Sequence, residues 1–128
     1  MNTAFAFLDS RFIVPQHLQI QTFNNFSKVN DINISFYGNE PVGSEFKHLL
    51  FLDYLESSKD NGYLFFTIEQ LTLKNGFLNE ELITFALKKS VNLYFANEQC
   101  KITSIPEMRE IQLLLYSKNL SLNFEKQY

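Results

Sequence analysis

Short apolar runs alternate with segments of helical periodicity along most of the chain, and this alternation limits the possible folds more than any other feature. The apolar runs cover residues 3–8, 31–37, 63–67 and 91–96, each about the length of one strand. Apolar residues at helical spacing cover residues 15–30, 43–57, 79–90 and 104–118. Strands that alternate with helices predict a parallel sheet with right-handed crossovers. We therefore expect a three-layer α/β/α domain with a mostly parallel sheet of about four strands, in the order 2-1-3-4, as in flavodoxin-like folds.

Residues typical of caps and turns support these boundaries. Pro15 is well placed in the first turn of a helix, and Asn61-Gly62 and Asn75-Gly76 are turn signals. Ser104 and Glu107 have the spacing of a capping box at the start of the last helix. We predict one α/β domain over residues 1–119 and an amphipathic C-terminal tail over residues 120–128.

Composition and charge exclude several classes of function. The chain has 128 residues, a formal charge of −3 and 11 basic residues that are scattered, so no basic patch for nucleic acid is expected. A single cysteine, Cys100, cannot form an internal disulfide or a cysteine-rich zinc site, and we interpret it as an incidental thiol. No glycine-rich cofactor loop is present, and two distant histidines do not make a metal site, so neither a cofactor nor a metal is predicted. Recruitment of a metal by Glu40 and Glu98 stays an open alternative. No signal peptide or membrane span is recognisable, which favours a cytoplasmic protein without membrane contact.

Polar side chains are concentrated where the first strand leads into the first helix. The carboxyl edge of a parallel sheet is where open α/β folds bind ligands. Arg11 has the donor geometry to bind a phosphate or carboxylate, and His17 can act as an acid or base near neutral pH. The alternative is that Ser10 caps the helix and the other side chains are solvated. The residues of this group are Ser10, Arg11, Gln16, His17 and Gln19.

The other predicted strands also end in polar residues. Glu40 and Ser44 follow the second strand, Gln70 follows the third and Glu98 follows the fourth. A carboxylate and a hydroxyl after the second strand can bind a sugar hydroxyl or take a proton, although Ser44 can equally be a helix N-cap. Polar residues at the ends of all four predicted strands indicate a hydrogen-bonding pocket. In it, residues 9–19 and 67–72 should face each other.

Motifs along residues 4–118 match those of one small bacterial family. They are Ser10-Arg11, Val14-Pro15-Gln16-His17-x-Gln19, Glu40, Gln70-Leu71 and Phe95-Ala96-x-Glu98. The chain resembles the sporadic carbohydrate cluster proteins, whose genes lie among genes for surface polysaccharides. It departs from that family at Ala4-Phe5, where Gly-Tyr is usual, and at Pro41, where Tyr is usual. The resemblance implies a role in the metabolism of sugars or surface polysaccharides.

The layout of the first and third strands also matches a second family. The catalytic domain of serine recombinases has a strand ending in Arg-x-Ser, a helix beginning near a Gln and an arginine-rich stretch after the third strand. This chain resembles that domain in fold. Ser10 falls near the position of the nucleophile. Residues 67–73, which should hold the arginines, read TIEQLTL. Leu and Gln cannot stabilise a phosphoryl transition state, so the resemblance implies a resolvase-like fold without recombination chemistry.

Three functional hypotheses follow. The first is a cytosolic protein that binds a phosphorylated or nucleotide-linked sugar at the carboxyl edge. If it is an enzyme, His17 or Glu40 moves the proton. The second is a non-catalytic module that regulates a glycosyltransferase or sugar synthase and associates through Ile111, Leu114 and Leu115 of its last helix. A homodimer is expected, because small sheets with an exposed edge and apolar terminal helices usually bury them in a partner. The third is a degenerate recombinase-like DNA binder. For the first hypothesis the expected substrate-binding residues are Ser10, Arg11, Gln16, Gln19, Ser44, Gln70 and Glu98.

Overall fold

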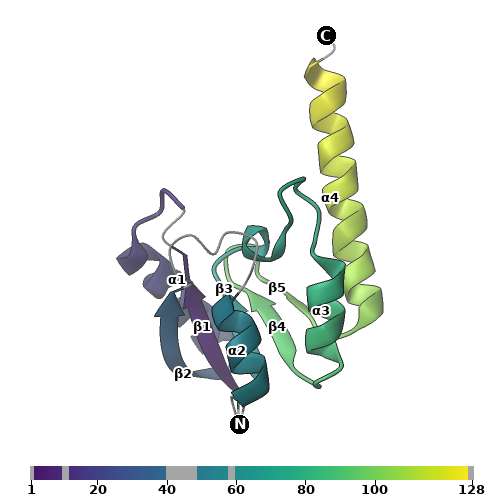
Figure 1. Ribbon diagram of the computed structural model, residues 1–128. Helices are drawn as coiled ribbons and strands as arrows, with labels where there is room; N and C mark the ends of the chain where they lie inside the picture. Colours follow the sequence, from purple (N-terminus) through teal and green to yellow (C-terminus); the bar gives the residue numbers. More distant parts are fainter. Residues whose placement is uncertain (1, 10–11, 40–48, 58–59, 127–128) are drawn as a thin grey trace.

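The described part of the chain forms a mixed sheet of five strands in the order β2-β1-β3-β4-β5 (Figure 1). The computed structural model describes residues 2–9, 12–39, 49–57 and 60–126. Strands β1, β2, β3 and β4 are parallel, whereas β5 is antiparallel to β4. The strands are β1 (Asn2–Leu8), β2 (Ile32–Asn39), β3 (Gly62–Phe65), β4 (Asn92–Phe95) and β5 (Cys100–Ile102).

The predicted α/β class and the mostly parallel sheet are confirmed, but the predicted order 2-1-3-4 lacked the fifth strand. Strand β5 has only three residues, so it is too short to show an alternating pattern in the sequence. It is joined to β4 by a tight turn in which Gln99 has a φ of 54°. The hairpin adds an antiparallel edge to an otherwise parallel sheet, which is common in open α/β folds.

Helices lie on both faces of this sheet. The helices are α1 (Gln16–Asn30), α2 (Leu49–Ser57), α3 (Glu80–Leu87) and α4 (Ile105–Lys126), and η1 (Ile68–Leu71) is a short 3₁₀ helix. Helix α1 covers one face, and α2, α3 and the first turns of α4 cover the other. The predicted second helix is described only from Leu49 onward, because residues 43–48 lie outside the described residues. Helix α4 runs past the predicted end at residue 118 and through the predicted domain boundary.

The central strand β1 separates small from large side chains. Ala4 and Ala6 face α1, where they pack with Phe23 and other residues of one apolar cluster. Phe5 and Phe7 point to the opposite face because successive side chains of a strand alternate. There Phe7 is fully buried, and its ring stacks on that of Phe65 at a centroid distance of 5.0 Å. Most of the buried phenylalanines therefore lie on this face of the sheet, which α2, α3 and α4 cover.

Gly62, predicted to belong to a turn, is instead the first residue of β3. A Cβ atom at this position would lie 2.7 Å from Cε2 of Tyr94 and 3.3 Å from the backbone oxygen of Thr3. Such contacts are too short for carbon, so only glycine lets β3 approach both neighbouring strands here.

The predicted capping box at the start of α4 is present with one difference. The Ser104 hydroxyl accepts a hydrogen bond from the Glu107 N–H at 3.4 Å. The Glu107 carboxylate in turn accepts one from the Thr103 N–H at 3.1 Å, and the hydroxyls of Thr103 and Ser104 donate to the same carboxylate. These bonds, the one from the Thr103 hydroxyl above all, hold the pKa of Glu107 below its usual value.

A lowered pKa in the folded state makes the contribution of Glu107 to stability depend on pH. The contribution is present above the ordinary glutamate pKa of about 4.3 and is lost as the pH falls through the lowered value. We expect Glu107→Gln to lower the melting temperature at neutral pH, and this difference from the unmodified chain to shrink as the pH falls below the ordinary glutamate pKa of about 4.3. Thermal melts followed by circular dichroism over a series of pH values check this. A difference that persists in acid would contradict the role of the ionised carboxylate.

Candidate functional site

The loops after β1 and β3 lie against each other at the carboxyl edge of the sheet. The Gln70 side chain, just beyond β3, donates a hydrogen bond to the backbone oxygen of Phe7 at 3.0 Å. The ring of Phe12, in the loop after β1, lies 6.2 Å from that of Phe66. These contacts join Gln70 to Phe7 and Phe12 to Phe66, so the two loops are neighbours. That residues 9–19 and 67–72 themselves face each other stays a prediction.

Gln19 fixes the loop between β1 and α1. Its side chain is fully buried, and its Oε1 accepts a hydrogen bond from the Asp9 N–H at 3.1 Å. Its Nε2 donates to the backbone oxygens of Asp9 and Val14, both at 3.0 Å. The carboxamide thus forms the hydrogen bonds that these backbone groups would otherwise form with a neighbouring strand. We call Gln19 and Gln70, which acts in the same way, the carboxamide braces.

Gln70 fixes the end of β3. Its Oε1 accepts hydrogen bonds from the backbone N–H groups of Phe66 at 2.6 Å and Thr67 at 3.1 Å. Together with its bond to Phe7, this side chain connects β1 to the start of η1. Thr67 and Gln70 also form a capping box for η1. The Thr-x-x-Gln spacing is the sequence signal for this capping role. Gln70 was predicted instead to contact a ligand.

Glu98 holds the turn between β4 and β5 against η1. One of its carboxylate oxygens accepts a hydrogen bond from the Thr67 hydroxyl at 2.5 Å. The other accepts one from the Ile68 N–H at 3.1 Å. A carboxylate at the start of a helical turn is favourable because the N–H groups there lack partners within the helix. In this structure Glu98, like Gln19 and Gln70, binds the backbone of its own chain.

The remaining predicted site residues fall into two groups. His17 and Gln16 lie exposed in the first turn of α1, and the Gln16 Nε2 donates to the Asn39 Oδ1 at 3.4 Å. The predicted residues Ser10, Arg11, Glu40 and Ser44 lie outside the described residues. Whether Arg11, His17 and Glu40 converge, which is what an enzyme would require, therefore stays a prediction.

Asp9 is a carboxylate that the prediction treated only as the end of a strand. It is 3 % exposed and lies directly after the central strand, next to the backbone bonds of Gln19. An acidic residue immediately after an apolar run of strand length is the signal that marks it in the sequence.

Cys100 does not have the properties of a nucleophile. Burial, followed by the charge of Glu98, raises the pKa of its thiol to about 11. A thiol with such a pKa is protonated at neutral pH and reacts poorly. Within the described residues, no cluster of three or more potential metal ligands is found.

Comparisons with known proteins identify the architecture. One solved structure with the same arrangement is a resolvase family site-specific recombinase from Streptococcus pneumoniae, with a TM-score of 0.67 over 99 % of this chain and 94 % of that one. The fold is resolvase-like. The N-terminal catalytic domain of TP901-1 integrase also matches, with a TM-score of 0.55 over the full length of both chains. Identities of 10 % and 13 % limit this likeness to the fold. No family model and no curated protein matches the chain.

The resolvase-like fold confirms one of the two resemblances and leaves the other without support. Nothing in the comparisons points to the sporadic carbohydrate cluster proteins. Within the resolvase-like fold, residues 67–73 contain no arginine. They form instead the N-cap residue Thr67, the helix η1 and the two residues after it. No helix in the described residues is both long and apolar enough to cross a membrane.

Proposed function

We propose that the chain is a non-catalytic interaction module built on a resolvase-like fold, and that it forms homodimers through helix α4. The observation that carries this proposal is the exposed apolar surface of α4. Leu113, Leu114 and Tyr116 are 67 %, 69 % and 51 % exposed, and they lie within four consecutive positions. Helix α4 also extends well beyond the sheet and the other helices (Figure 1).

One side of α4 is already used within the chain. Met108 is buried, and Ile105, Ile111 and Leu115 pack against the core on the α2 face of the sheet. Of the three residues predicted to form the contact, Ile111 and Leu115 therefore have partners in the chain itself, and Leu114 is exposed. Exposed apolar side chains gathered on a protruding helix favour a second apolar surface as their partner.

The hydrogen bonds at the carboxyl edge support a non-catalytic role. The described candidates Gln19, Gln70 and Glu98 bind backbone groups of the chain, and residues 67–73 contain no arginine. An arrangement of this kind holds loops in place, whereas phosphoryl transfer needs cations directed at the transferred group.

The effect of a charge on the exposed side of α4 tests this proposal. We expect the purified chain to be a dimer in sedimentation equilibrium. Leu114→Glu should weaken the dimer by at least about tenfold, because a carboxylate would have to leave water at the contact. Leu18→Glu is the matched control, since Leu18 is 42 % exposed on α1, which covers the opposite face of the sheet from α4, and it should leave the dimer intact. A monomeric unmodified chain, or equal effects of both variants, would overturn the proposal.

Sugar binding at the carboxyl edge is a second candidate function. The carboxamide braces favour it, because loops held rigidly by buried side chains are a suitable support for a binding site. In this candidate Arg11 binds the anion, and His17 or Glu40 moves the proton. A rise in melting temperature with sugar phosphates or nucleotide sugars that is lost in Arg11→Ala would replace the interaction module by this function.

DNA binding is a third candidate function. One solved structure of similar fold is described as a site-specific recombinase. The formal charge of −3 makes DNA binding less favourable for this chain. Binding to duplex DNA that falls steeply with increasing salt would support a recombinase-like DNA binder and count against the proposed module.

A further inference from the structure

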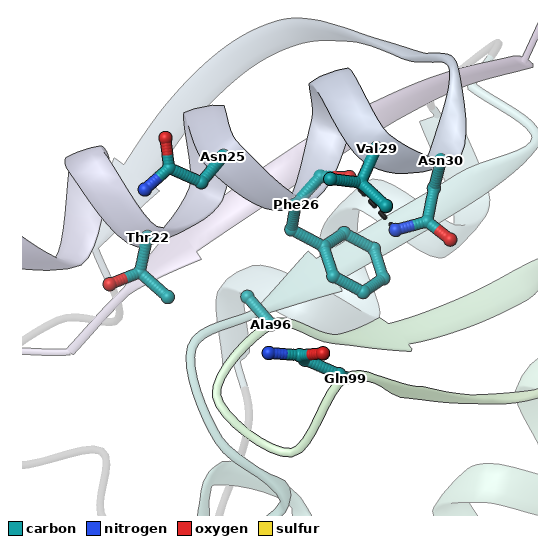
Figure 2. A pocket seen from close by; sticks show the side chains of 7 residues that line it. All are labelled: Thr22, Asn25, Phe26, Val29, Asn30, Ala96 and Gln99. Atoms are coloured by element: carbon teal, nitrogen blue, oxygen red, sulfur yellow. Dashed lines mark hydrogen bonds between the residues drawn. The ribbon is translucent and has the colours of Figure 1, made fainter.

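A pocket of about 300 Å³ lies between helix α1 and the turn that joins β4 to β5 (Figure 2). None of the predicted site residues lines this pocket. It is on the α1 side of the sheet, whereas α4 packs on the other side. A ligand bound here would therefore leave the surface of α4 accessible, and the inference below does not depend on the proposed dimer.

The pocket combines an apolar base with uncharged polar walls. Phe26 and Ala96 form the base and are 8 % and 4 % exposed, and Val29 is an exposed apolar residue beside them. Figure 2 shows the Phe26 ring between the helix and the turn, with Gln99 across from the helix. No charged side chain is among the described residues that line the pocket.

The polar groups of the pocket differ in how they are used. The Thr22 hydroxyl donates to the backbone oxygen of Leu18, and the Asn30 Nδ2 donates to that of Phe26, both at 2.9 Å. Among the described residues, the carboxamides of Asn25 and Gln99 have no hydrogen-bond partner. Each offers two donors and one acceptor to a ligand, one from the helix and one from the turn.

Gln99 has a backbone conformation that glutamine seldom adopts. Its φ of 54° lies in the left-handed region, where glycine or asparagine is favoured. The turn is fixed on both sides, because the Asn97 N–H donates to the backbone oxygen of Phe66 at 2.8 Å and Glu98 binds Thr67 and Ile68. A long polar side chain is thus held at the pocket at a cost in backbone energy. Such a residue is a candidate for function rather than for stability.

We propose that this pocket binds an uncharged, polyhydroxylated ring, such as one monosaccharide unit. Hydroxyl groups on a ring both donate and accept, which matches carboxamides on two walls, and the C–H groups of the ring match the apolar base. The absence of cations among the described lining residues argues against a phosphate group. Burial of the Phe26 ring argues against a nucleobase, which would need an exposed aromatic face on which to stack. The small volume suits a single ring.

Titrations followed by the backbone amide signals of the ¹⁵N-labelled chain test this inference. The probes are D-glucose, D-galactose and N-acetyl-D-glucosamine, each up to about 50 mM, which is well above a millimolar dissociation constant. We expect at least one sugar to produce saturable shifts at Asn25, Phe26 and Gln99. Gln99→Gly should weaken this binding by about tenfold, because the carboxamide is lost.

Ser90→Gly is the matched control. Ser90 also has a left-handed backbone, with a φ of 59°, but it does not line the pocket. Both glycine variants should keep or raise the melting temperature, since glycine accepts this conformation without strain. Only Gln99→Gly should weaken sugar binding. The inference is overturned if no sugar gives saturable shifts, if both variants bind equally well, or if adenosine or uridine shifts these signals and the sugars do not.

Discussion

Phe7→Ala should lower the free energy of unfolding by about 3–5 kcal/mol, which is the range for removing a buried phenylalanine side chain. Phe7 is fully buried on the central strand and contacts rings on the neighbouring strand β3 and on helix α2. Its ring centroid lies 5.0 Å from that of Phe65 and 5.6 Å from that of Phe51 in α2. No other side chain can fill the space, because the surrounding rings already contact one another. Urea unfolding followed by circular dichroism measures the change.

Phe85→Ala is the control for this experiment. Phe85 is 42 % exposed on α3, and its removal should cost less than about 1 kcal/mol. Equal effects of the two substitutions would show that the aromatic cluster around Phe7 does not dominate the stability of this core.

Gln70→Ala should lower the free energy of unfolding by at least about 3 kcal/mol. The substitution leaves the buried N–H groups of Phe66 and Thr67 and the backbone oxygen of Phe7 without their partner, and each such group costs about 1–3 kcal/mol. Gln70→Met separates this polar cost from the cost of a cavity, because methionine fills a similar volume without hydrogen bonds. We expect Gln70→Met to lose most of the same stability in urea unfolding.

Gln21→Ala provides the baseline for the Gln70 variants. Gln21 is exposed on α1, where alanine is a good helix former, so its replacement should change stability by less than about 0.5 kcal/mol. A Gln70→Met variant as stable as the unmodified chain would mean that water or backbone movement satisfies the three groups. The role of Gln70 as a brace would then be wrong.

The sequence predicted the parallel strands well because each one is a compact apolar run. The stretch Ala4-Phe5-Ala6-Phe7-Leu8 became β1, and Tyr63-Leu64-Phe65 became most of β3. Strand β5 was missed because three residues carry no periodicity. Helix η1 was missed because Thr67 and Gln70 were interpreted as polar residues at a strand end, although their spacing is that of a capping box.

The candidate site was harder to predict, for a physical reason. A glutamine at the end of a strand can direct its carboxamide to a ligand or to the backbone, and the amino-acid pattern is the same in both cases. Gln19 and Gln70 bind the backbone in this fold, because the loops leave buried N–H and C=O groups that need partners. The left-handed backbone of Gln99 was not predicted, since a positive φ leaves no mark on the sequence unless glycine or asparagine occupies the position.

The carboxamide braces carry no net charge. An ion pair in their place would weaken with increasing ionic strength and would break when its acid was protonated, whereas an amide does neither. The backbone around Asp9 and Thr67 is therefore held by Gln19 and Gln70 in the same way in dilute buffer and in concentrated salt. If binding to this edge of the sheet varies with salt, the variation reports charges on the ligand and on exposed side chains, rather than a rearrangement of the loops that the braces hold.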